Sequence, residues 1–225
     1  MKQALVTGAS SGIGAAIVSR LLAVGWGVTG ISRGPLAAAH PALRHVVLDL
    51  AAADRAGVAN GLGELAPDAL VHAAGLLRVG RLGALDAQAG AAMWHVHVAA
   101  AALLADVVLP RMPPGGRIVL IGSRTASGSA GRSQYAASKA ALVGMARSWA
   151  AELAPQGITV NVVSPGATDT PMLHDPARAG VAPAMPPIGR FVRPEEVAGT
   201  VAFLLGAEAG AITGQQIVMC GGASL

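Results

Sequence analysis

The sequence predicts one α/β domain over residues 1–225, in which helices flank both faces of a doubly wound parallel sheet of about seven strands. Three observations predict this fold. Short apolar runs alternate with helical stretches along the whole chain. These runs are continuously apolar, as in strands that are covered on both faces. Hydrophobic residues make up 53% of the chain and charged residues 12%, which suits one large core.

The predicted elements follow one another in a βαβ pattern. The second and third strands are joined by a brief connection, which leaves room for a rudimentary helix at most. In such a fold, ligands bind at the carboxyl ends of the strands. The predicted strands are residues 3–7, 27–31, 45–48, 69–72, 117–121, 158–163 and 215–219. The predicted helices are residues 13–24, 53–64, 86–109, 135–154 and 194–206.

A glycine-rich turn joins the first strand to the first helix. Residues 5–14 read LVTGASSGIG, in which the glycines form a G-x-x-x-G-x-G pattern. Glycine is needed where the backbone turns sharply and where a side chain would keep a phosphate from the amides. The following helix then points its positive end at that phosphate. The turn predicts a dinucleotide site made of Gly8, Ser10, Ser11, Gly12, Ile13 and Gly14.

The same turn also fits a different class of protein. Residues 8–12, GASSG, match the G-x-S-x-G nucleophile elbow of α/β-hydrolases, with Ser10 as the nucleophile. That elbow normally follows several strands, whereas this one follows the first. A hydrolase also needs an acid and then a histidine downstream, and His174 is the only histidine beyond residue 97. The dinucleotide site is therefore preferred, with the hydrolase as an alternative.

The residues after the second strand indicate which dinucleotide binds. A carboxylate that binds the ribose 2′-hydroxyl usually stands about 20 residues past the glycines, but Ser32 and Arg33 occupy that place here. A guanidinium can hold a 2′-phosphate bidentately. NADP(H) is therefore predicted in preference to NAD(H), unless Arg33 is only a solvated loop residue. Asp49 and Leu50, after the third strand, are placed at the adenine end, although Asp49 could equally be an ordinary strand-end cap.

The only tyrosine of the chain stands four residues before one of its two lysines. Tyr135 and Lys139 lie in a predicted helix that opens near Ser133, so their side chains share one face. A free phenol, with a pKa of about 10, is a poor acid or base at neutral pH. A neighbouring ammonium group lowers that pKa and makes the phenol useful in acid–base chemistry. Ser123 follows a strand, where its hydroxyl could meet a ligand oxygen.

Four motifs carry a resemblance that runs the length of the chain: TGASSGIG, GS at 122–123, YAASK and NVVSPG. With them, the chain resembles the classical short-chain dehydrogenases/reductases. The resemblance implies a seven-stranded Rossmann-type sheet, a nicotinamide cofactor, and hydride transfer to a carbonyl compound or from an alcohol. It also implies that Tyr135 donates the proton, that Lys139 lowers the pKa of Tyr135 and binds the nicotinamide ribose, and that Ser123 holds the substrate oxygen.

The resemblance also implies cofactor contacts after the later strands. Pro165 and Gly166 would lie beside the nicotinamide, and Thr170 would reach its amide or the phosphates. The remaining cofactor-binding positions in this assignment are Ala74, Gly75 and Thr168.

Two positions depart from the family pattern. The family commonly has Asn-Asn-Ala-Gly after the fourth strand, where this chain has HAAG at 72–75. A catalytic asparagine in the following helix, which positions a water that leads protons from the lysine to solvent, is replaced by His97. A histidine could relay protons itself, because it donates and accepts near neutral pH. We prefer this interpretation, with His97 as a catalytic residue; the alternative is a catalytically impaired nucleotide-binding protein.

A proline-rich stretch, residues 171–189, interrupts the pattern and predicts a substrate lid near residues 168–190, although a plain surface loop would have a similar sequence. Few aromatic residues are available to line the pocket, which favours an aliphatic or alicyclic ketone. Arg124, beside Ser123, would suit an acidic group, as in a 3-oxoacyl-thioester reductase, if its side chain does not face solvent. The apolar inner face of the lid would be Met172, Leu173 and Met185.

Composition argues against several partners. The formal net charge is +4 and the arginines are scattered, so no nucleic-acid partner is predicted. The single cysteine, Cys220, excludes an internal disulfide and fits a reducing, cytoplasmic compartment. The apolar run at 97–110 is interrupted by Asp106 and ends at Pro110, which predicts that it is too short to span a membrane.

Two further expectations concern metals and assembly. His95 and His97 diverge on a helix and no acidic or cysteine cluster joins them, so no metal site is predicted. The helices predicted at 86–109 and 135–154 have more apolar faces than one sheet can cover. In the family that the chain resembles, such helices pair between subunits, which implies a homotetramer or a homodimer.

Overall fold

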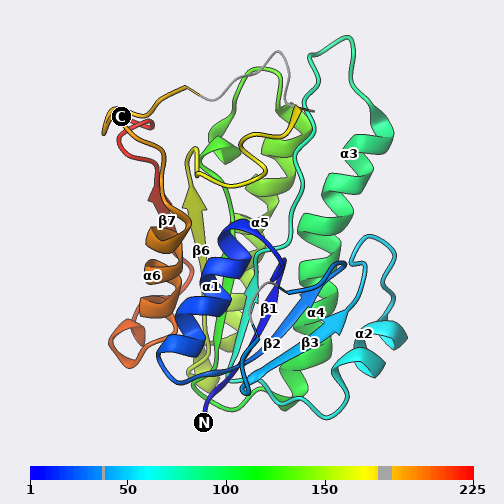
Figure 1. Ribbon diagram of the computed structural model, residues 1–225, viewed down its shortest axis with the longest axis vertical. Helices are drawn as coiled ribbons and strands as arrows, with labels where there is room; N and C mark the ends of the chain where they lie inside the picture. The colour runs from blue at the N-terminus through cyan, green and yellow to red at the C-terminus, as the bar shows by residue number, and fades with distance from the viewer. Residues whose placement is uncertain (37–38, 177–183) are drawn as a thin grey trace.

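The structure is a computed structural model and describes residues 1–36, 39–176 and 184–225. Its centre is a parallel sheet of seven strands in the order β3-β2-β1-β4-β5-β6-β7, with helices on both faces (Figure 1). The predicted fold class is confirmed, and each strand lies within two residues of its predicted bounds. The strands are β1 Gln3–Thr7, β2 Gly27–Ser32, β3 Leu43–Val47, β4 Ala69–His72, β5 Arg117–Ile121, β6 Thr159–Pro165 and β7 Gln216–Met219.

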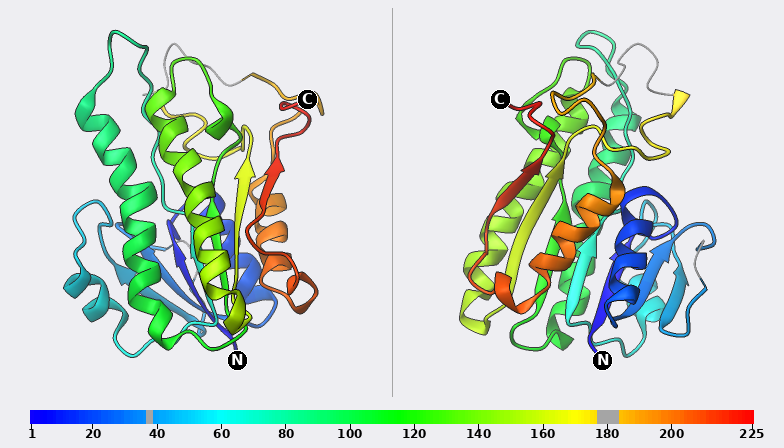
Figure 2. Two further views of the ribbon diagram at one scale, coloured as in Figure 1. Left: turned by 180° about the vertical axis from the view of Figure 1, so that it is seen from behind. Right: turned by 60° about the vertical axis from the view of Figure 1, so that its left-hand side comes forward.

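The helices cover the two faces of the sheet as separate layers. α1 and α6 pack together on one face, and α2, α4 and α5 pack on the other (Figure 2). Successive side chains of a strand point to opposite faces, so Leu5 joins one core and Val6 the other. Both are fully buried, which explains why the strands are continuously apolar. The helices are α1 Gly12–Ala23, α2 Arg55–Leu62, α3 Ala87–Trp94, α4 Ala100–Val108, α5 Ser133–Leu153 and α6 Pro194–Leu204.

The order of the strands creates a crevice at one edge of the sheet. From β1 the chain winds outward to β3, and it then returns to β4, beside β1, and winds outward to β7 on the other side. At such a switch point, the loops that follow the two central strands diverge and leave room for a ligand. The loops after β1, β4, β5 and β6 lie at the end of the sheet opposite the N-terminus (Figure 1).

The helix predicted at 86–109 is continuous but has an irregular turn at its centre. α3 passes into a π turn, η1 (His95–Ala99), and the chain then continues as α4. In this turn the N–H of Ala100 bonds to the carbonyl of His95, five residues back. π turns within α-helices are frequent at functional sites.

The whole helix, Ala87–Arg111, has 25 residues and contains an 18-residue window with a mean hydropathy of 1.7, so its length and composition would allow it to cross a membrane. The helix is therefore longer than the apolar run at 97–110 from which the prediction was made, and the prediction that this run does not span a membrane stays a prediction. A core helix passes the same test, and Ala101, Leu104 and Val108 of this helix are buried in the core that α4 and α5 form with the sheet.

The proline-rich segment is described only in part, because residues 177–183 of the predicted lid lie outside the described residues. Before them, Leu173 is buried and Met172 is half-buried. After them, Met185 is 57% exposed. Met172 and Leu173 are thus shielded from solvent and Met185 is not, and the lid itself stays a prediction.

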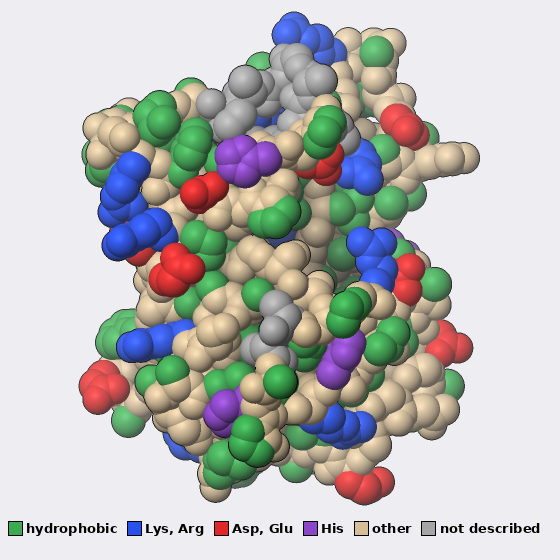
Figure 3. Space-filling view, viewed as in Figure 1, with side chains coloured by type: hydrophobic (Ala, Val, Ile, Leu, Met, Phe, Trp, Pro, Cys, Tyr) green, Lys and Arg blue, Asp and Glu red, His purple; other side chains and the backbone are tan. Residues whose placement is uncertain are grey.

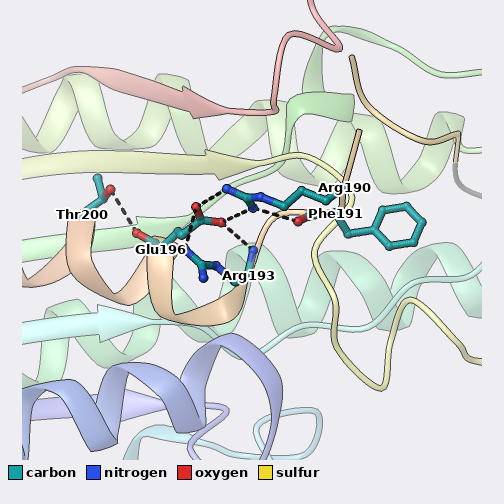
Figure 4. A network of polar contacts seen from close by, with 5 residues as sticks. All are labelled: Arg190, Phe191, Arg193, Glu196 and Thr200. Carbon is teal, nitrogen blue, oxygen red and sulfur yellow. Dashed lines mark hydrogen bonds and ion pairs between the residues drawn. The ribbon is translucent and has the colours of Figure 1, made fainter. Parts of the chain in front are cut away.

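The return of this segment to the sheet is fixed by an ion pair at the start of α6 (Figure 4). The guanidinium of Arg190 donates two hydrogen bonds to the carboxylate of Glu196, at 2.7 and 2.8 Å. Glu196 also accepts from the backbone N–H of Arg193 at 2.8 Å, which caps α6. One carboxylate therefore anchors both the helix and the end of the segment.

Charged side chains are dispersed over the face of the molecule drawn in Figure 3. Basic and acidic groups alternate on that face rather than gathering by sign. A nucleic-acid surface would require a continuous basic patch. The expectation that the protein has no nucleic-acid partner stays a prediction.

Candidate active site

A cleft of about 700 Å³ opens at the carboxyl edge of the sheet. The loops after β1, β2, β4, β5 and β6 all contribute to its walls. Every residue assigned from the sequence to catalysis or cofactor binding lines this one cleft. These residues are Gly8, Ser10, Ser11, Gly12, Ile13, Gly14, Ser32, Arg33, Asp49, Leu50, Ala74, Gly75, His97, Ser123, Tyr135, Lys139, Pro165, Gly166, Thr168 and Thr170.

The glycine-rich turn needs glycine at two positions. Gly8 has a φ of +67°, and a Cβ there would lie 2.9 Å from the backbone of Ala73. A Cβ on Gly14 would lie 2.1 Å from the carbonyl oxygen of Gly8. The turn therefore packs closely against the loop after β4, and Gly12 and Ile13 at the start of α1 line the cleft. A backbone cradle at a helix N-terminus fits the pyrophosphate of a dinucleotide.

The hydrolase alternative finds no support around Ser10. Neither His174 nor Asp169 belongs to the described residues that line the cleft. Instead, Nε2 of His174 lies 2.9 Å from Oδ1 of Asp169, and both side chains are about two-thirds exposed, at 66% and 65%. The histidine that a Ser10 nucleophile needs is thus paired with a carboxylate at the surface.

Tyr135 and Lys139 project from the first turns of α5 into the cleft, and both are buried. This agrees with the shared helix face expected from their spacing. Nζ of Lys139 lies 6.0 Å from the centre of the Tyr135 ring and donates to the carbonyl of Ile121, at the end of β5, at 2.8 Å. Burial lowers the pKa of Lys139 from 10.5 to about 7.

Ser123 is held in a fixed orientation just after β5. Its Oγ lies 2.8 Å from Oγ1 of Thr125 and accepts the backbone N–H of Thr125 at 3.2 Å. Ser123 thereby caps the short 3₁₀ turn Arg124–Ser127. Thr125 was not singled out from the sequence, although a second hydroxyl two residues after Ser123 is a detectable signal.

His97 lies in the π turn, and its ring is fully buried beside Tyr135, with the ring centres 5.5 Å apart in an edge-to-face arrangement. Nε2 accepts the backbone N–H of Leu76 at 3.1 Å, so the ring proton is on Nδ1. Nδ1–H then donates to Oγ of Ser138 at 2.9 Å, and Ser138 donates to the carbonyl of Tyr135 at 2.8 Å. Burial, and next the charge of Lys139, hold the pKa of His97 well below its usual value.

A second set of buried hydrogen bonds, separate from that of His97, is formed by His72. Its Nε2–H donates to the carbonyl of Val96 in the π turn, and its Nδ1 accepts the hydroxyl of Thr7, both at 3.0 Å. Oγ1 of Thr7 accepts the N–H groups of Ala73 and Ala74, also at 3.0 Å. Burial, and next the charge of Lys139, lower the pKa of His72 to about 3. His72 therefore stays neutral and joins β1, β4 and the π turn.

Ser32 and Arg33, at the end of β2, line the end of the cleft that is assigned to the adenine half of the dinucleotide, which we call the far end. The hydroxyl of Ser32 donates to the carbonyl of Gly34 at 2.7 Å and therefore accepts from Nε2 of His45 at 2.9 Å. The proton of Ser32 is thus committed within the protein. Arg33 is exposed, and among the described residues that line this end of the cleft its guanidinium is a cation that a ligand could meet. Asp49 lies nearby, where its carboxylate accepts the backbone N–H of Ala51 at 3.0 Å.

Comparison with known proteins identifies the family. Residues 8–224 match a family model described as enoyl-(acyl carrier protein) reductase. The chain is 37% identical over 238 residues to the 3-oxoacyl-[acyl-carrier-protein] reductase FabG of Salmonella typhimurium, which covers 98% of this chain and 96% of that protein. The chain belongs to the short-chain dehydrogenase/reductase family. As a member of this family, it is an oxidoreductase.

Two further matches show the breadth of this short-chain dehydrogenase/reductase family. The cyclic-di-GMP-binding biofilm dispersal mediator protein of Escherichia coli is 38% identical over 225 residues, covering 95% of this chain and 93% of that protein. The crystal structure of a short chain dehydrogenase from Burkholderia cenocepacia in complex with NADP has a TM-score of 0.88 at 37% identity. It covers 100% of this chain and 98% of that chain.

Two histidines distinguish this short-chain dehydrogenase/reductase from the family pattern described above. The resemblance places His97 and His72 where the family commonly has asparagine, and both lie within the electrostatic reach of Lys139. Sequence reasoning noted the substitution at His72 but assigned it no role; the signal was a histidine inside a continuously apolar strand. In the described ranges, no group of three or more His, Cys, Asp or Glu side chains could hold a metal ion.

Proposed function

We propose that this short-chain dehydrogenase/reductase is an NADP(H)-preferring carbonyl reductase that interconverts a ketone or aldehyde with an alcohol. The observation that carries the proposal is that Tyr135, Lys139 and Ser123 line the same cleft as the glycine-rich turn. The substrate class that we favour is a 3-oxoacyl thioester or a small aliphatic or alicyclic ketone. The FabG relative supports the first of these.

In this proposal the chain orients the substrate and moves one proton. When bound, the reduced nicotinamide supplies the hydride that reaches the carbonyl carbon. Ser123 donates a hydrogen bond to the carbonyl oxygen, and Tyr135 passes its phenolic proton to that oxygen as negative charge develops there. Lys139, when protonated, favours the phenolate that Tyr135 leaves behind. Its pKa of about 7 means that this charge is present below neutral pH in the cofactor-free protein.

The preference for NADP(H) over NAD(H) is proposed from the residues at the end of the cleft that contains Arg33. The backbone cradle at Gly8 and Gly14 suits a pyrophosphate, and Arg33 is placed for a 2′-phosphate. The Burkholderia structure in complex with NADP supports NADP(H) over NAD(H). The proposal is tested by measuring the oxidation of NADPH and NADH in parallel against a panel of ketones, aldehydes and 3-oxoacyl thioesters. Turnover of an ester without any nucleotide would instead support the hydrolase.

Arg33→Asp should shift preference toward NADH. A charged hydrogen bond of about 1.5–3 kcal/mol is lost and a repulsive carboxylate is added, so the NADPH/NADH ratio of kcat/KM should fall by roughly 10- to 100-fold. Arg20→Asp, an exposed reversal of charge at the end of α1 outside the cleft, should leave the ratio unchanged. An unchanged ratio in Arg33→Asp removes Arg33 from the cofactor site.

His97→Asn should keep kcat within about tenfold of the wild type, because an amide can accept from the N–H of Leu76 and donate to Ser138 as the imidazole does. His97→Leu, which can do neither, should lose more. Because both ring nitrogens are already bonded, we propose that His97 positions Tyr135 and the Leu76 loop. If His97 is instead a relay that titrates, His97→Asn will change the pH profile of kcat, which decides between the two roles.

A second candidate is a nucleotide-binding protein with little or no catalysis. It is favoured by the two histidines in place of asparagines and by the likeness to the cyclic-di-GMP-binding protein of E. coli. Tight binding of NADPH with no oxidation against the whole panel would support it.

The homotetramer or homodimer and the cytoplasmic location stay predictions. Leu82, Leu85 and Trp94, on α3 and the loop before it, are 93%, 41% and 50% exposed. Such apolar side chains suit a subunit interface. Sedimentation of the purified protein would determine the assembly.

A further inference from the structure

Three arginines line the cleft together with Ser123 and Tyr135. Arg78 follows β4, Arg124 follows Ser123 directly, and Arg132 stands three residues before Tyr135. Two of these segments are joined: the chain bridges Gly80 to Arg132, and the N–H of Gly80 donates to the carbonyl of Gly131 at 2.9 Å. The fold therefore places arginines from three segments in the walls of the cavity that is also lined by the residues proposed to hold and protonate the carbonyl.

Few acidic side chains belong to the described lining of the cleft. Among the described residues that line the cleft, Asp49 is the one acidic side chain, and it lies near Ser32 and Arg33 at the far end. Asp175 reaches Arg78 only loosely, at 3.9 Å, with both side chains more than a third exposed. Nη1 of Arg124 donates to the carbonyl of Ala223 at 3.2 Å, which leaves its charge unneutralised by that contact.

Burial strengthens the attraction of one of these arginines, Arg132, for an anion. Arg132 is 8% exposed, so its surroundings have a lower dielectric constant than water. An anion brought alongside a guanidinium in such a place is attracted more strongly than at the surface. The planar fork of a guanidinium also matches the two oxygens of a carboxylate.

The remaining walls at this end are aliphatic. Tyr135 packs with Leu77 and Met93, and Leu76 and Met172 lie against this cluster. A hydrocarbon chain suits these neighbours, and a charged group suits the arginines. We propose that the substrate is an aliphatic oxo acid, with a carboxylate a few bonds from the carbonyl carbon, held by Arg78, Arg124 and Arg132. The inference rests on the proposed carbonyl reduction and, of the two substrate classes proposed above, selects the small aliphatic ketone over the thioester and adds a carboxylate to it.

The test compares matched pairs of substrates. The 2-, 3- and 4-oxo acids of one chain length and their methyl esters are offered with NADPH, and kcat/KM is measured for each. We expect one acid to exceed its own ester by about tenfold or more, because the ester has lost the charge-assisted hydrogen bonds. Arg124→Gln and Arg132→Gln should bring that ratio toward one. Arg81→Gln, an exposed residue outside the cleft, should keep it.

Two outcomes overturn the inference. Equal or better turnover of the esters by the wild type excludes a carboxylate site, and stronger turnover of a phosphorylated ketone such as dihydroxyacetone phosphate reassigns it to phosphate. Binding separates this failure from failure of the proposed reduction. If a 3-hydroxy acid binds the NADP-loaded protein at least tenfold more tightly than its amide, the anion site stands even where no carbonyl is reduced. The same calorimetry on Arg124→Gln guards against misfolding of the variant at buried Arg132.

Discussion

Tyr135→Phe should reduce kcat for carbonyl reduction by about 10³-fold, because general acid catalysis by a positioned side chain contributes about 10²- to 10⁴-fold. The change removes only the phenolic oxygen. The ring keeps its contacts with Leu77 and Met93 and its edge-to-face packing with His97. The affinity for NADPH, measured by calorimetry, should therefore change by less than about twofold, since the phenol serves the chemistry more than the binding of the nucleotide.

The neighbouring variant Gln134→Ala provides the control. Gln134 precedes Tyr135 on α5, bonds to the carbonyl of Asp86, and does not belong to the described lining of the cleft. Its kcat should match the wild type. Wild-type kinetics in Tyr135→Phe would show that the proton comes from another group, and a joint loss of kcat and NADPH binding would show that Tyr135 is mainly structural.

Lys139→Met should lower kcat by about 10²-fold or more and at the same time stabilise the cofactor-free protein. The loss of activity follows from removing the charge that favours the phenolate of Tyr135. The gain in stability follows from burial, since a buried ammonium group is costly to desolvate and a methionine side chain is not. Function and stability therefore oppose each other at this position, as at many active sites.

The stability difference between Lys139→Met and the wild type should depend on pH, because the pKa of Lys139 differs between the folded and unfolded states. The pKa of Lys139 is about 7 in the folded protein and 10.5 as the reference value for the unfolded chain. Between these values the unfolded state binds more protons, so the free energy of unfolding of the wild type rises with pH. The stability gap between Lys139→Met and the wild type should be largest at or below pH 7 and should shrink toward pH 10.

Urea unfolding at pH 6, 8 and 10 measures this gap. Lys2→Met is the matched control, because Lys2 is the other lysine of the chain and is exposed. It should show no comparable gap at any of the three pH values. A gap for Lys139→Met that stays constant with pH would mean that Lys139 is protonated throughout this range in the folded protein.

The sequence was sufficient where the relevant physics is local. The shared face of Tyr135 and Lys139 follows from helical spacing, and the close packing of Gly8 and Gly14 follows from the order strand, turn, helix. The strands could be placed because burial on both faces leaves continuous apolar runs. These features depend on a few neighbouring residues, so pattern and propensity determine them.

What could not be predicted depends on contacts across the fold. His72 joins Thr7, 65 residues away, to the carbonyl of Val96, and no local pattern shows that link. The π turn exists within a stretch whose sequence is that of an ordinary apolar helix. Likewise, Arg78 and Arg132 are far apart in sequence, and contacts such as the bridge from Gly80 to Arg132 and the packing of Tyr135 with Leu77 bring their segments together.

The central claim is that a hydride passes from the nicotinamide to the substrate carbon while this chain supplies the proton. The most direct measurement uses NADPH carrying deuterium at C4, in separate samples for each face, with an accepted carbonyl substrate in ordinary water. We expect deuterium from one face alone to appear on the carbinol carbon of the product. In Tyr135→Phe, the transfer of this deuterium should be slower by about 10³-fold. Product formed without deuterium from either face, or with label exchanged into water, would contradict the account.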